Sequence, residues 1–282
     1  MNRREFILAA GTALTACSRP ASAPTPSEGA AAAPLGLQLY TLRDLMAQDV
    51  AATLALVAET GFREVEFAGY FDHAPARMRA LLDGAGLSAP SSHIGYAELL
   101  EDAARTIDHA AELGHAYIVV PYLDEGSRSL DDYRRHGENF NRWAEACAAA
   151  GLQFGYHNHE FEFVETEGVI PYDLLLAETD PELVKMELDL AWAEKGGADA
   201  VAYFEAWPGR FPMVHLKDLD AAGQEVDIGT GSVDFERILA KAKLAGLRHG
   251  FVERDHAADP RLSIEHSFRA IQPVWSRSMA AS

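Results

Sequence analysis

One sequence pattern, called here the repeated phrase, occurs five times along the chain. It consists of a helical apolar pattern, a glycine and then a short apolar run. It appears as AETGFREVEF, DGAGLSAPSSH, AELGHAYIVV, AAAGLQFGYHNH and KLAGLRHGFVE. In each phrase the glycine stands where a helix ends, because glycine adopts the left-handed conformation of a helix terminus at little cost. Each phrase therefore predicts a helix followed by a strand.

Three further apolar runs lack this lead-in but complete a set of eight strands. The predicted strands cover 36–40, 64–67, 89–93, 117–120, 153–157, 184–188, 213–216 and 250–253, with helical patterns between them, for example at 50–59, 133–149 and 235–245. Strands that alternate with helices predict an α/β fold with a parallel sheet, and eight repeats favour a closed (β/α)8 TIM barrel over an open doubly wound sheet. No GxGxxG follows the first strand, which argues against a dinucleotide-binding fold.

The predicted barrel occupies 35–282 as a single domain, and a different kind of segment precedes it. Residues 1–17 have the pattern of an export signal, with Arg3 and Arg4 before the apolar stretch 6–16. The paired arginines resemble a twin-arginine (Tat) signal, which exports proteins that have already folded. Residues 18–34 are rich in alanine, proline and serine, a composition typical of a flexible linker.

Cys17 ends the sequence LTAC, which resembles the lipobox of bacterial lipoproteins, where the cysteine carries the lipid. We therefore expect a Tat-exported, periplasmic protein whose only membrane attachment is a lipid on Cys17. The alternative is an unprocessed N-terminus with an incidental cysteine. The second cysteine, Cys147, lies in a helical stretch and is interpreted as a small apolar side chain, so no disulfide is expected.

The charge balance excludes one class of partner. The chain has 43 acidic and 24 basic side chains, for a net charge of −19. Binding to a phosphate backbone depends on Lys and Arg releasing condensed counterions, so a nucleic-acid partner is not expected. An endonuclease is accordingly the weakest of the alternative functions.

Polar residues gather where the predicted strands end, at the face that carries the active site in TIM-barrel enzymes. Such groups are costly to bury without partners. His115 and His249 follow helix-ending glycines at the opposite face and are interpreted as surface residues. The candidates at the strand ends are Gln38, Tyr40, Glu66, His93, His157, His159, Asp189, His215, Lys217 and Glu253.

The densest local signal is YHNHEFE at 156–162. His157 and His159 point to one side if they lie on a strand, because side chains alternate with a period of two; the alternative is a structural pair of histidines. The set His157, Asp189, His215 and Glu253 falls on the fifth to eighth predicted strands and offers nitrogen and oxygen donors without a thiolate. Such donors suit one divalent ion, with Mn²⁺ expected first and Zn²⁺, Co²⁺ or Mg²⁺ as alternatives.

Several segments resemble the xylose isomerase-like superfamily of sugar phosphate isomerases and epimerases: GLQLYTLRD, GFREVEFAGY, YHNHEFEF, ELDLAW, HLKDLD with the later GTGSVDF, and FVERD. The resemblance spans about 35–275. It implies one divalent metal held by a Glu, an Asp, a His and a Glu on the fifth to eighth strands, and the last three correspond to Asp189, His215 and Glu253. The fifth-strand position departs from the family pattern, because His157 stands there and Glu162 follows five residues later; either can complete the site.

The resemblance also implies a reaction. The YHNHEFEF variant is similar to a branch that acts on keto-sugars and inososes, including dehydratases and 3-keto-glycoside lyases. A metal-assisted proton abstraction next to a carbonyl would need a base, for which His159, Glu162 and His93 are candidates. Lys217 is a candidate to neutralise the developing oxyanion, with a structural salt bridge to Asp218 as the alternative.

The expected substrate is a small keto-sugar or keto-glycoside. The candidate substrate-binding residues are Gln38, Tyr40, Glu66 and Trp192. A sugar phosphate is not favoured, because the only candidate phosphate cradle is the short turn 229–231 and export separates the protein from cytoplasmic phosphosugars. Epimerisation, isomerisation and elimination remain open outcomes, and the rival function is a non-catalytic sugar- or metal-binding lipoprotein.

Overall fold

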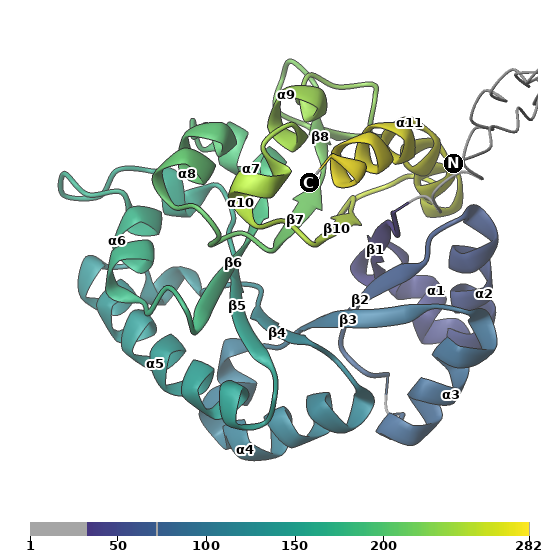
Figure 1. Ribbon diagram of the computed structural model, residues 1–282, viewed down its shortest axis with the longest axis horizontal. Coiled ribbons are helices and arrows are strands. Elements are labelled where there is room, and N and C mark those ends of the chain that lie inside the picture. The colour runs from purple at the N-terminus through teal and green to yellow at the C-terminus, as the bar shows by residue number, and fades with distance from the viewer. Residues whose placement is uncertain (1–32, 72, 282) are drawn as a thin grey trace, which may run out of the picture. The chain divides into compact units, whose positions relative to one another are not determined.

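A computed structural model of the chain describes residues 33–71 and 73–281. Within them, eight parallel strands close into a barrel in the order β1-β10-β7-β6-β5-β4-β3-β2, with helices placed around the outside (Figure 1). The barrel strands are β1 Gly36–Gln38, β2 Glu64–Ala68, β3 Ser88–His93, β4 Tyr117–Val120, β5 Gln153–His157, β6 Val184–Asp189, β7 Met213–Leu216 and β10 His249–Val252. The predicted TIM barrel is confirmed. The predicted export signal and Cys17 lie outside the described residues.

The helices follow the strands around the barrel. They are α1 Arg43–Gln48, α2 Val50–Thr60, α3 Pro75–Ala85, α4 Tyr96–Leu113, α5 Leu130–Ala149, α6 Pro171–Glu178, α7 Leu190–Lys195, α8 Ala200–Ala206, α9 Phe235–Leu239, α10 Ala242–Ala245 and α11 Pro260–Ala280. Each of the five glycines in the repeated phrase has a positive φ at the end of a helix. Across the described residues, no helix combines the length and apolarity that a membrane span requires.

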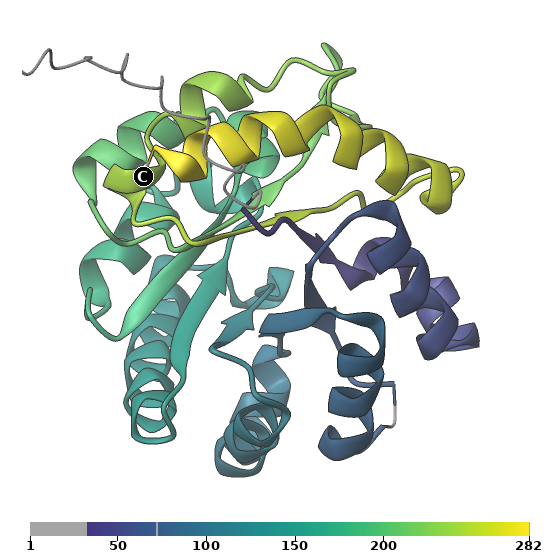
Figure 2. The same cartoon turned by 45° about the vertical axis from the view of Figure 1, so that its right-hand side comes forward.

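The barrel closes between its first and last strands. Gly36 and Leu37 of β1 pair with Phe251 and Val252 of β10. A Cβ atom on Gly36 would lie 2.3 Å from the Phe251 ring, so only glycine fits at this position. Helix α11 runs along the outside of this closure (Figure 2), where the Trp275 indole donates a 2.7 Å hydrogen bond to the carbonyl of Pro34.

The barrel interior has an apolar lower layer and a polar upper layer. Tyr117, Val119, Met213 and Phe251 form a buried cluster inside the barrel. Because side chains alternate along a strand, the next inward positions lie one layer nearer the C-terminal ends of the strands. On β7, for example, Met213 lies in the apolar layer and His215 in the polar layer. The fold thus places polar side chains in the upper barrel, above a solid apolar base.

Most predicted boundaries agree with the structure to within two residues, and the differences have local causes. β1 ends at Gln38, not at 40, because Leu39–Leu42 form a 3-10 turn and the Gln38 side chain accepts a hydrogen bond from the backbone of Tyr40. The helix predicted at 235–245 is two helices, α9 and α10. A short hairpin was not predicted: β8 Asp218–Leu219 pairs with β9 Glu225–Val226.

The interpretation of His115 as a surface residue is wrong. Its side chain is buried, with 5% of the residue exposed, and its Nδ1 lies 2.7 Å from the carbonyl of Ala89. Burial lowers the pKa of His115 to about 4, so the imidazole is neutral. His249 is partly buried, and its Nδ1 lies 2.8 Å from the Glu64 carboxylate. Both histidines have structural partners, which the sequence pattern did not indicate.

Candidate functional site

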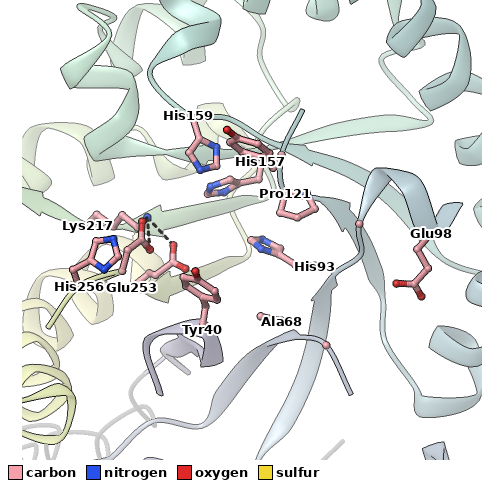
Figure 3. A pocket seen from close by; sticks show the side chains of 14 residues that line it. Tyr40, Ala68, His93, Glu98, Pro121, His157, His159, Lys217, Glu253 and His256 are labelled. Carbon is pink, nitrogen blue, oxygen red and sulfur yellow. Dashed lines mark hydrogen bonds and ion pairs between the residues drawn. The ribbon is translucent and has the colours of Figure 1, made fainter. Parts of the chain in front are cut away.

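A cavity of about 540 Å³ opens at the C-terminal ends of the barrel strands. In Figure 3, His93, His157 and His159 lie around its open centre, together with Lys217 and Glu253. Six predicted site residues line it: Tyr40, His93, His157, His159, Lys217 and Glu253. Its other lining residues include Gly95, Pro121, Tyr122, Asp255 and His256. The structure therefore brings most of the strand-end candidates together at one place.

Four of the candidates form a group that fits a metal ion. Ligand atoms of His157, Asp189, His215 and Glu253 lie within 4.8 Å of one another, at the ends of β5, β6, β7 and β10. The distance from Asp189 Oδ2 is 4.0 Å both to His157 Nε2 and to His215 Nδ1. This is the set that the sequence predicted, with His157 in the fifth-strand position.

Sequence reasoning missed a fifth member of this neighbourhood, Glu187. Its carboxylate lies 2.7 Å from His93, 3.4 Å from His157 and 3.2 Å from His215, so these four residues form a second, overlapping group of possible ligands. The signal was present, because Glu187 is two residues before Asp189 on the same strand and therefore shares its inward face. The hydrophobic flanks Met186 and Leu188 made the segment look like a core strand.

Buried polar atoms in these groups support the fit to a cation. Among residues 33–71 and 73–281, none forms a hydrogen bond with His157 Nδ1, Glu187 Oε1 or Asp189 Oδ2, although all three atoms are buried. Buried polar atoms without a hydrogen bond are rare in folded proteins because they are costly. Burial raises the pKa of Asp189 to about 6, although the positive charges of Lys217 and His215 oppose this rise. A cation bound here would offset these costs.

His215 is held between carboxylates on both sides of its ring. Its Nδ1 lies 2.7 Å from Glu253, and its Nε2 lies 2.7 Å from Glu66. Gln38 donates a 2.7 Å hydrogen bond to Glu66, and Ser91 also donates to this carboxylate. Gln38 and Glu66 are fully buried, and the described cavity lining does not include them. The structure thus places these two predicted substrate contacts beneath the cavity, where they orient His215.

His93 carries a positive charge in this arrangement. Burial alone would lower its pKa, but the charge of Glu66 and the hydrogen bond to Glu187 outweigh burial and raise it to about 9. A protonated His93 is a proton donor at neutral pH. The structure therefore favours an acid or hydrogen-bond donor at this position over the base that the sequence left open.

Lys217 is a buried cation among four carboxylates. Its Nζ lies 2.9 Å from Glu253, 3.0 Å from Asp255, 3.4 Å from Asp189 and 3.8 Å from Glu225. Burial would lower the pKa of the amine, but these charges hold it well above its usual value. The predicted alternative partner, Asp218, instead accepts backbone hydrogen bonds. Lys217 therefore offsets part of the negative charge on this wall of the cavity.

His159 is a neutral histidine of the cavity, as is His157, whose pKa burial also lowers well below its usual value. Burial and then the charge of Lys217 lower the pKa of His159 to about 3. Its Nδ1 is buried and has no hydrogen-bond partner among the described residues. Trp192 stacks on it with ring centroids 5.9 Å apart and also lies 4.9 Å from the Lys217 ammonium group. Trp192 was a predicted substrate contact, but it is not among the described lining residues of the cavity. It instead packs against His159 and Lys217 and supports these two side chains.

Glu162 lies on a different side of the barrel wall from the predicted ligands. Its carboxylate accepts hydrogen bonds from the Tyr156 hydroxyl and, at 2.8 Å, from the backbone N–H of His159. Tyr156 faces outward, with its ring centroid 5.1 Å from Phe140 of α5. Burial raises the pKa of Glu162 to about 8. The structure thus brings His157, not Glu162, to the other ligands, and gives Glu162 the role of positioning His159.

Asn158 is a second positioning residue that the sequence analysis did not single out. It is fully buried between the two histidines of its segment. Its Oδ1 accepts a 3.0 Å hydrogen bond from the backbone N–H of Asp189, and its Nδ2 donates to the Asp189 carbonyl at 3.4 Å. Asn158 therefore ties the end of β5 to the end of β6, where two predicted ligands lie.

The candidate phosphate cradle is already occupied by a side chain. The backbone N–H groups of Gly229 and Gly231 donate to Asp218 Oδ2 at 2.9 and 3.0 Å, and Val233 donates to Asp218 Oδ1 at 3.0 Å. The turn thus binds the carboxylate of its own chain. These donors are not available to a phosphate.

The xylose isomerase-like TIM barrel family model matches residues 54–271 of the chain. The chain belongs to this family. A sugar phosphate isomerase/epimerase from Parabacteroides distasonis has a similar structure, with a TM-score of 0.76 and 30% sequence identity. The match covers 90% of the present chain and 98% of the Parabacteroides protein. A probable 3-DHS dehydratase from Bacillus anthracis, at 15% identity and a TM-score of 0.67, shares the fold; here the match covers 84% of this chain and 98% of that one.

Curated relatives of this xylose isomerase-like chain include inosose dehydratases. The one from Geobacillus kaustophilus is 30% identical over 190 residues, which is 59% of this chain and 61% of that protein. The one from Salmonella agona is 24% identical over 187 residues, which is 59% of this chain and 62% of that protein. The matches thus span about three fifths of these relatives' length.

Proposed function

We propose that this chain is a divalent-metal-dependent enzyme that removes a proton α to the carbonyl of a keto-sugar. The observation that carries the proposal is the group His157, Asp189, His215 and Glu253 at one cavity that also contains a neutral and a protonated histidine. Relatives that are inosose dehydratases and a similar structure of a sugar phosphate isomerase/epimerase support chemistry of this broad kind.

Each protein group has a role that follows from its charge. The four ligands would hold a divalent ion, which supplies Lewis-acid stabilisation for the negative charge that develops on the substrate oxygen. His159 is the candidate base, because it lines the cavity and its buried Nδ1 has no hydrogen-bond partner among the described residues. His93 is protonated, and because its Nε2–H is bound to the Glu187 carboxylate at 2.7 Å, its Nδ1–H is the group left to protonate the departing substrate oxygen. Trp192 and Glu162 keep the His159 ring and backbone in place.

The proposal extends to elimination as the favoured outcome. Loss of a substituent β to the ketone requires one group to take the α-proton and another to protonate the departing oxygen. His159 and His93 meet this requirement with opposite protonation states. Inosose dehydratases among the relatives support elimination, and the occupied turn at 229–231 supports an unphosphorylated sugar.

Proton exchange in D₂O tests the proposal directly. Protein loaded with Mn²⁺ is incubated with 3-keto-glycosides, inososes and simple ketoses, and NMR follows the α-carbon protons and the products. We expect metal-dependent deuterium incorporation or loss of the β-substituent with at least one class. Ligand binding without exchange or turnover would instead establish the non-catalytic binding protein, and exchange that persists in metal-stripped protein would refute the role of the ion.

A further inference from the structure

The imidazole of His159 is oriented by packing alone. It lines the site cavity (Figure 3), and within the described part of the chain neither of its ring nitrogens makes a hydrogen bond. Glu162 holds only the backbone N–H of this residue. A base works when its ring is held within about 10–20° of the productive geometry, so other contacts have to set the angle of this imidazole.

Three aromatic rings contact that imidazole, and they come from three different segments. Phe161, in the turn after β5, stacks on it with ring centroids 5.6 Å apart and an angle of 14°. Trp192, in α7, stacks on it at 5.9 Å and 19°. Tyr122, in the loop after β4, meets it edge-on at 5.1 Å and also contacts Phe161 edge-on at 5.6 Å. The orientation of His159 therefore depends on what fixes these rings.

Arg128 contacts two of the three rings. Its guanidinium carbon lies 3.3 Å from the centre of the Phe161 ring and 4.9 Å from the centre of the Tyr122 ring. Its Nε donates a 2.8 Å hydrogen bond to the carbonyl of Leu123, which anchors the side chain to the loop after β4. The residue is half-buried, and cation–π contacts strengthen when the cation is withdrawn from water. Arg128 thus joins the loop after β4 to the segment after β5 that carries His159.

The charge of Arg128 is not paired with a carboxylate. The chain has 43 acidic side chains, yet Arg128 forms no ion pair with any of those in the ranges 33–71 and 73–281. Its buried Nη2 makes no hydrogen bond within the same ranges. The same charge lies close enough to Glu162 to oppose the rise in the pKa of that carboxyl. The main counterpart of this cation is therefore a pair of aromatic rings, as expected of a group that holds them.

We propose that Arg128 is a positioning residue for the candidate base, because it clamps the rings of Phe161 and Tyr122 against the imidazole of His159. Arg128 is not among the described lining residues of the cavity, so it acts through these rings and not on the substrate. This inference rests on the proposed function, because it concerns the base of that reaction.

Chemical labelling tests the clamp without requiring turnover. Full-length protein loaded with Mn²⁺ is treated with diethyl pyrocarbonate, which modifies imidazole nitrogens. Peptide mass spectrometry then gives the rate at His159, with the exposed His266 of α11 as the internal reference. Arg128→Met keeps an unbranched side chain but removes the cation, so the rate at His159 should rise several-fold relative to His266 as the loosened rings admit the reagent. An unchanged ratio of the two rates would overturn the proposal.

Three further variants locate the effect. Phe161→Leu removes the ring that Arg128 contacts most closely and should raise the labelling ratio as Arg128→Met does. Arg128→Lys retains a cation, so its ratio should lie closer to that of the unmodified protein. The matched control is Arg134→Met, which removes an arginine of α5 paired with the exposed Asp131 and should leave the ratio unchanged. A rise in Arg134→Met, or none in Phe161→Leu, would refute the clamp.

Kinetics separates positioning from a general loss of structure. With a keto-sugar that exchanges its α-proton in D₂O, Arg128→Met should lower kcat about ten- to hundred-fold, because the base is misaligned. KM and metal content should stay nearly unchanged, because neither the substrate contacts nor the ligands are altered. A raised KM with unchanged kcat would show that the residue acts on substrate binding and would refute positioning of the base.

The failure of this inference is distinguishable from the failure of the proposed function. If α-proton exchange occurs but Arg128→Met alters neither kcat nor the labelling of His159, the proposed chemistry stands and the clamp is refuted. If no keto-sugar exchanges in the unmodified protein but labelling of His159 rises in both Arg128→Met and Phe161→Leu, the clamp stands and the proposed chemistry is refuted.

Discussion

Single side chains at this site perform two tasks at once, and Asp189 is the clearest case. Its Oδ1 accepts a 2.9 Å hydrogen bond from the backbone N–H of Trp192 and so caps α7. Its Oδ2 makes no hydrogen bond within the described residues and lies 3.4 Å from the Lys217 ammonium group. The first oxygen stabilises the fold and the second is available to a cation, so a substitution has to separate these roles.

Asp189→Asn should abolish metal binding and keep the fold. Asparagine retains an oxygen for the cap but loses the charge that a divalent ion requires, whereas Asp189→Ala also loses the cap, at a cost of about 1 kcal/mol in unfolding free energy. Elemental analysis gives the metal content, and thermal unfolding with and without EDTA gives the stabilisation by the ion. The control is Asp199→Asn, which changes the cap of α8 away from the cavity. Full metal occupancy in Asp189→Asn would contradict the assigned site.

His157 and Glu162 should respond differently to substitution. His157→Ala removes a ligand, so metal content should fall, while Glu162→Gln should leave metal content unchanged and reduce kcat, because Glu162 holds the backbone of His159. The control is Glu160→Gln, a partly exposed neighbour, which should change neither quantity. Loss of metal in Glu162→Gln with retention in His157→Ala would reverse the assignment.

Cys147 should be chemically inert in the folded protein. The side chain is fully buried, and burial raises the pKa of its thiol to about 12, so the reactive thiolate is absent at neutral pH. In a Cys17→Ala background, iodoacetamide at pH 8 should label Cys147 only after denaturation. Labelling of the native protein at the rate of a free thiol would show that the core around α5 opens readily.

At the scale of elements, the polar loop after β7 is organised by one carboxylate. Asp218 accepts backbone hydrogen bonds from Leu219, Gly229, Gly231 and Val233. These bonds tie the β8–β9 hairpin to the turn that precedes α9. The hairpin in turn supplies Glu225, whose carboxylate lies 3.8 Å from Lys217. The loop therefore sets the charge around the cavity wall.

Gly231→Ala should disrupt this loop. A Cβ atom at Gly231 would lie 2.3 Å from both Asp218 Oδ1 and the Leu219 carbonyl, a clash that costs about 1–3 kcal/mol in unfolding free energy. The matched control is Gly84→Ala inside α3, where a Cβ atom meets nothing within 4 Å and should stabilise the helix by about 0.5–1 kcal/mol. Urea denaturation measures the unfolding free energy of each variant. Equal stability of Gly231→Ala and Gly84→Ala would contradict the assigned role of the loop.

At the scale of the whole molecule, the barrel accounts for residues 33–71 and 73–281, and we propose that the preceding segment exports and anchors it. Cys17→Ala should release the protein from the membrane, because the lipid on that cysteine would be its only attachment. Fractionation of cells into membrane and soluble parts measures the result. Cys147→Ala is the matched control and should stay with the membrane. A Cys17→Ala protein that remains membrane-bound would refute the anchor.

The barrel could be predicted from the sequence because its determinants are local. A glycine after each amphipathic helix and a short apolar run after each glycine specify a βα unit without reference to distant residues. Five such units and three further apolar runs leave few architectures, and the predicted strands match β4, β5 and β7 at both ends. Strand ends then direct attention to one face of the barrel, where His157, Asp189, His215 and Glu253 were found.

Only the tertiary structure decided which polar groups touch, because that depends on side chains brought together from strands far apart in sequence. Glu187 meets His93 of β3 and His215 of β7, and no local pattern marks that contact. Glu162 and His157 were equivalent candidates in sequence, but the strand period turns His157 inward, while Glu162, beyond the strand end, bonds to the outward-facing Tyr156. Protonation states followed the same rule, since burial lowers the pKa of His159 to about 3, while at His93 the neighbouring carboxylates of Glu66 and Glu187 outweigh burial and raise the pKa to about 9. Sequence determined the barrel and the face that carries the site; packing determined the chemistry available there.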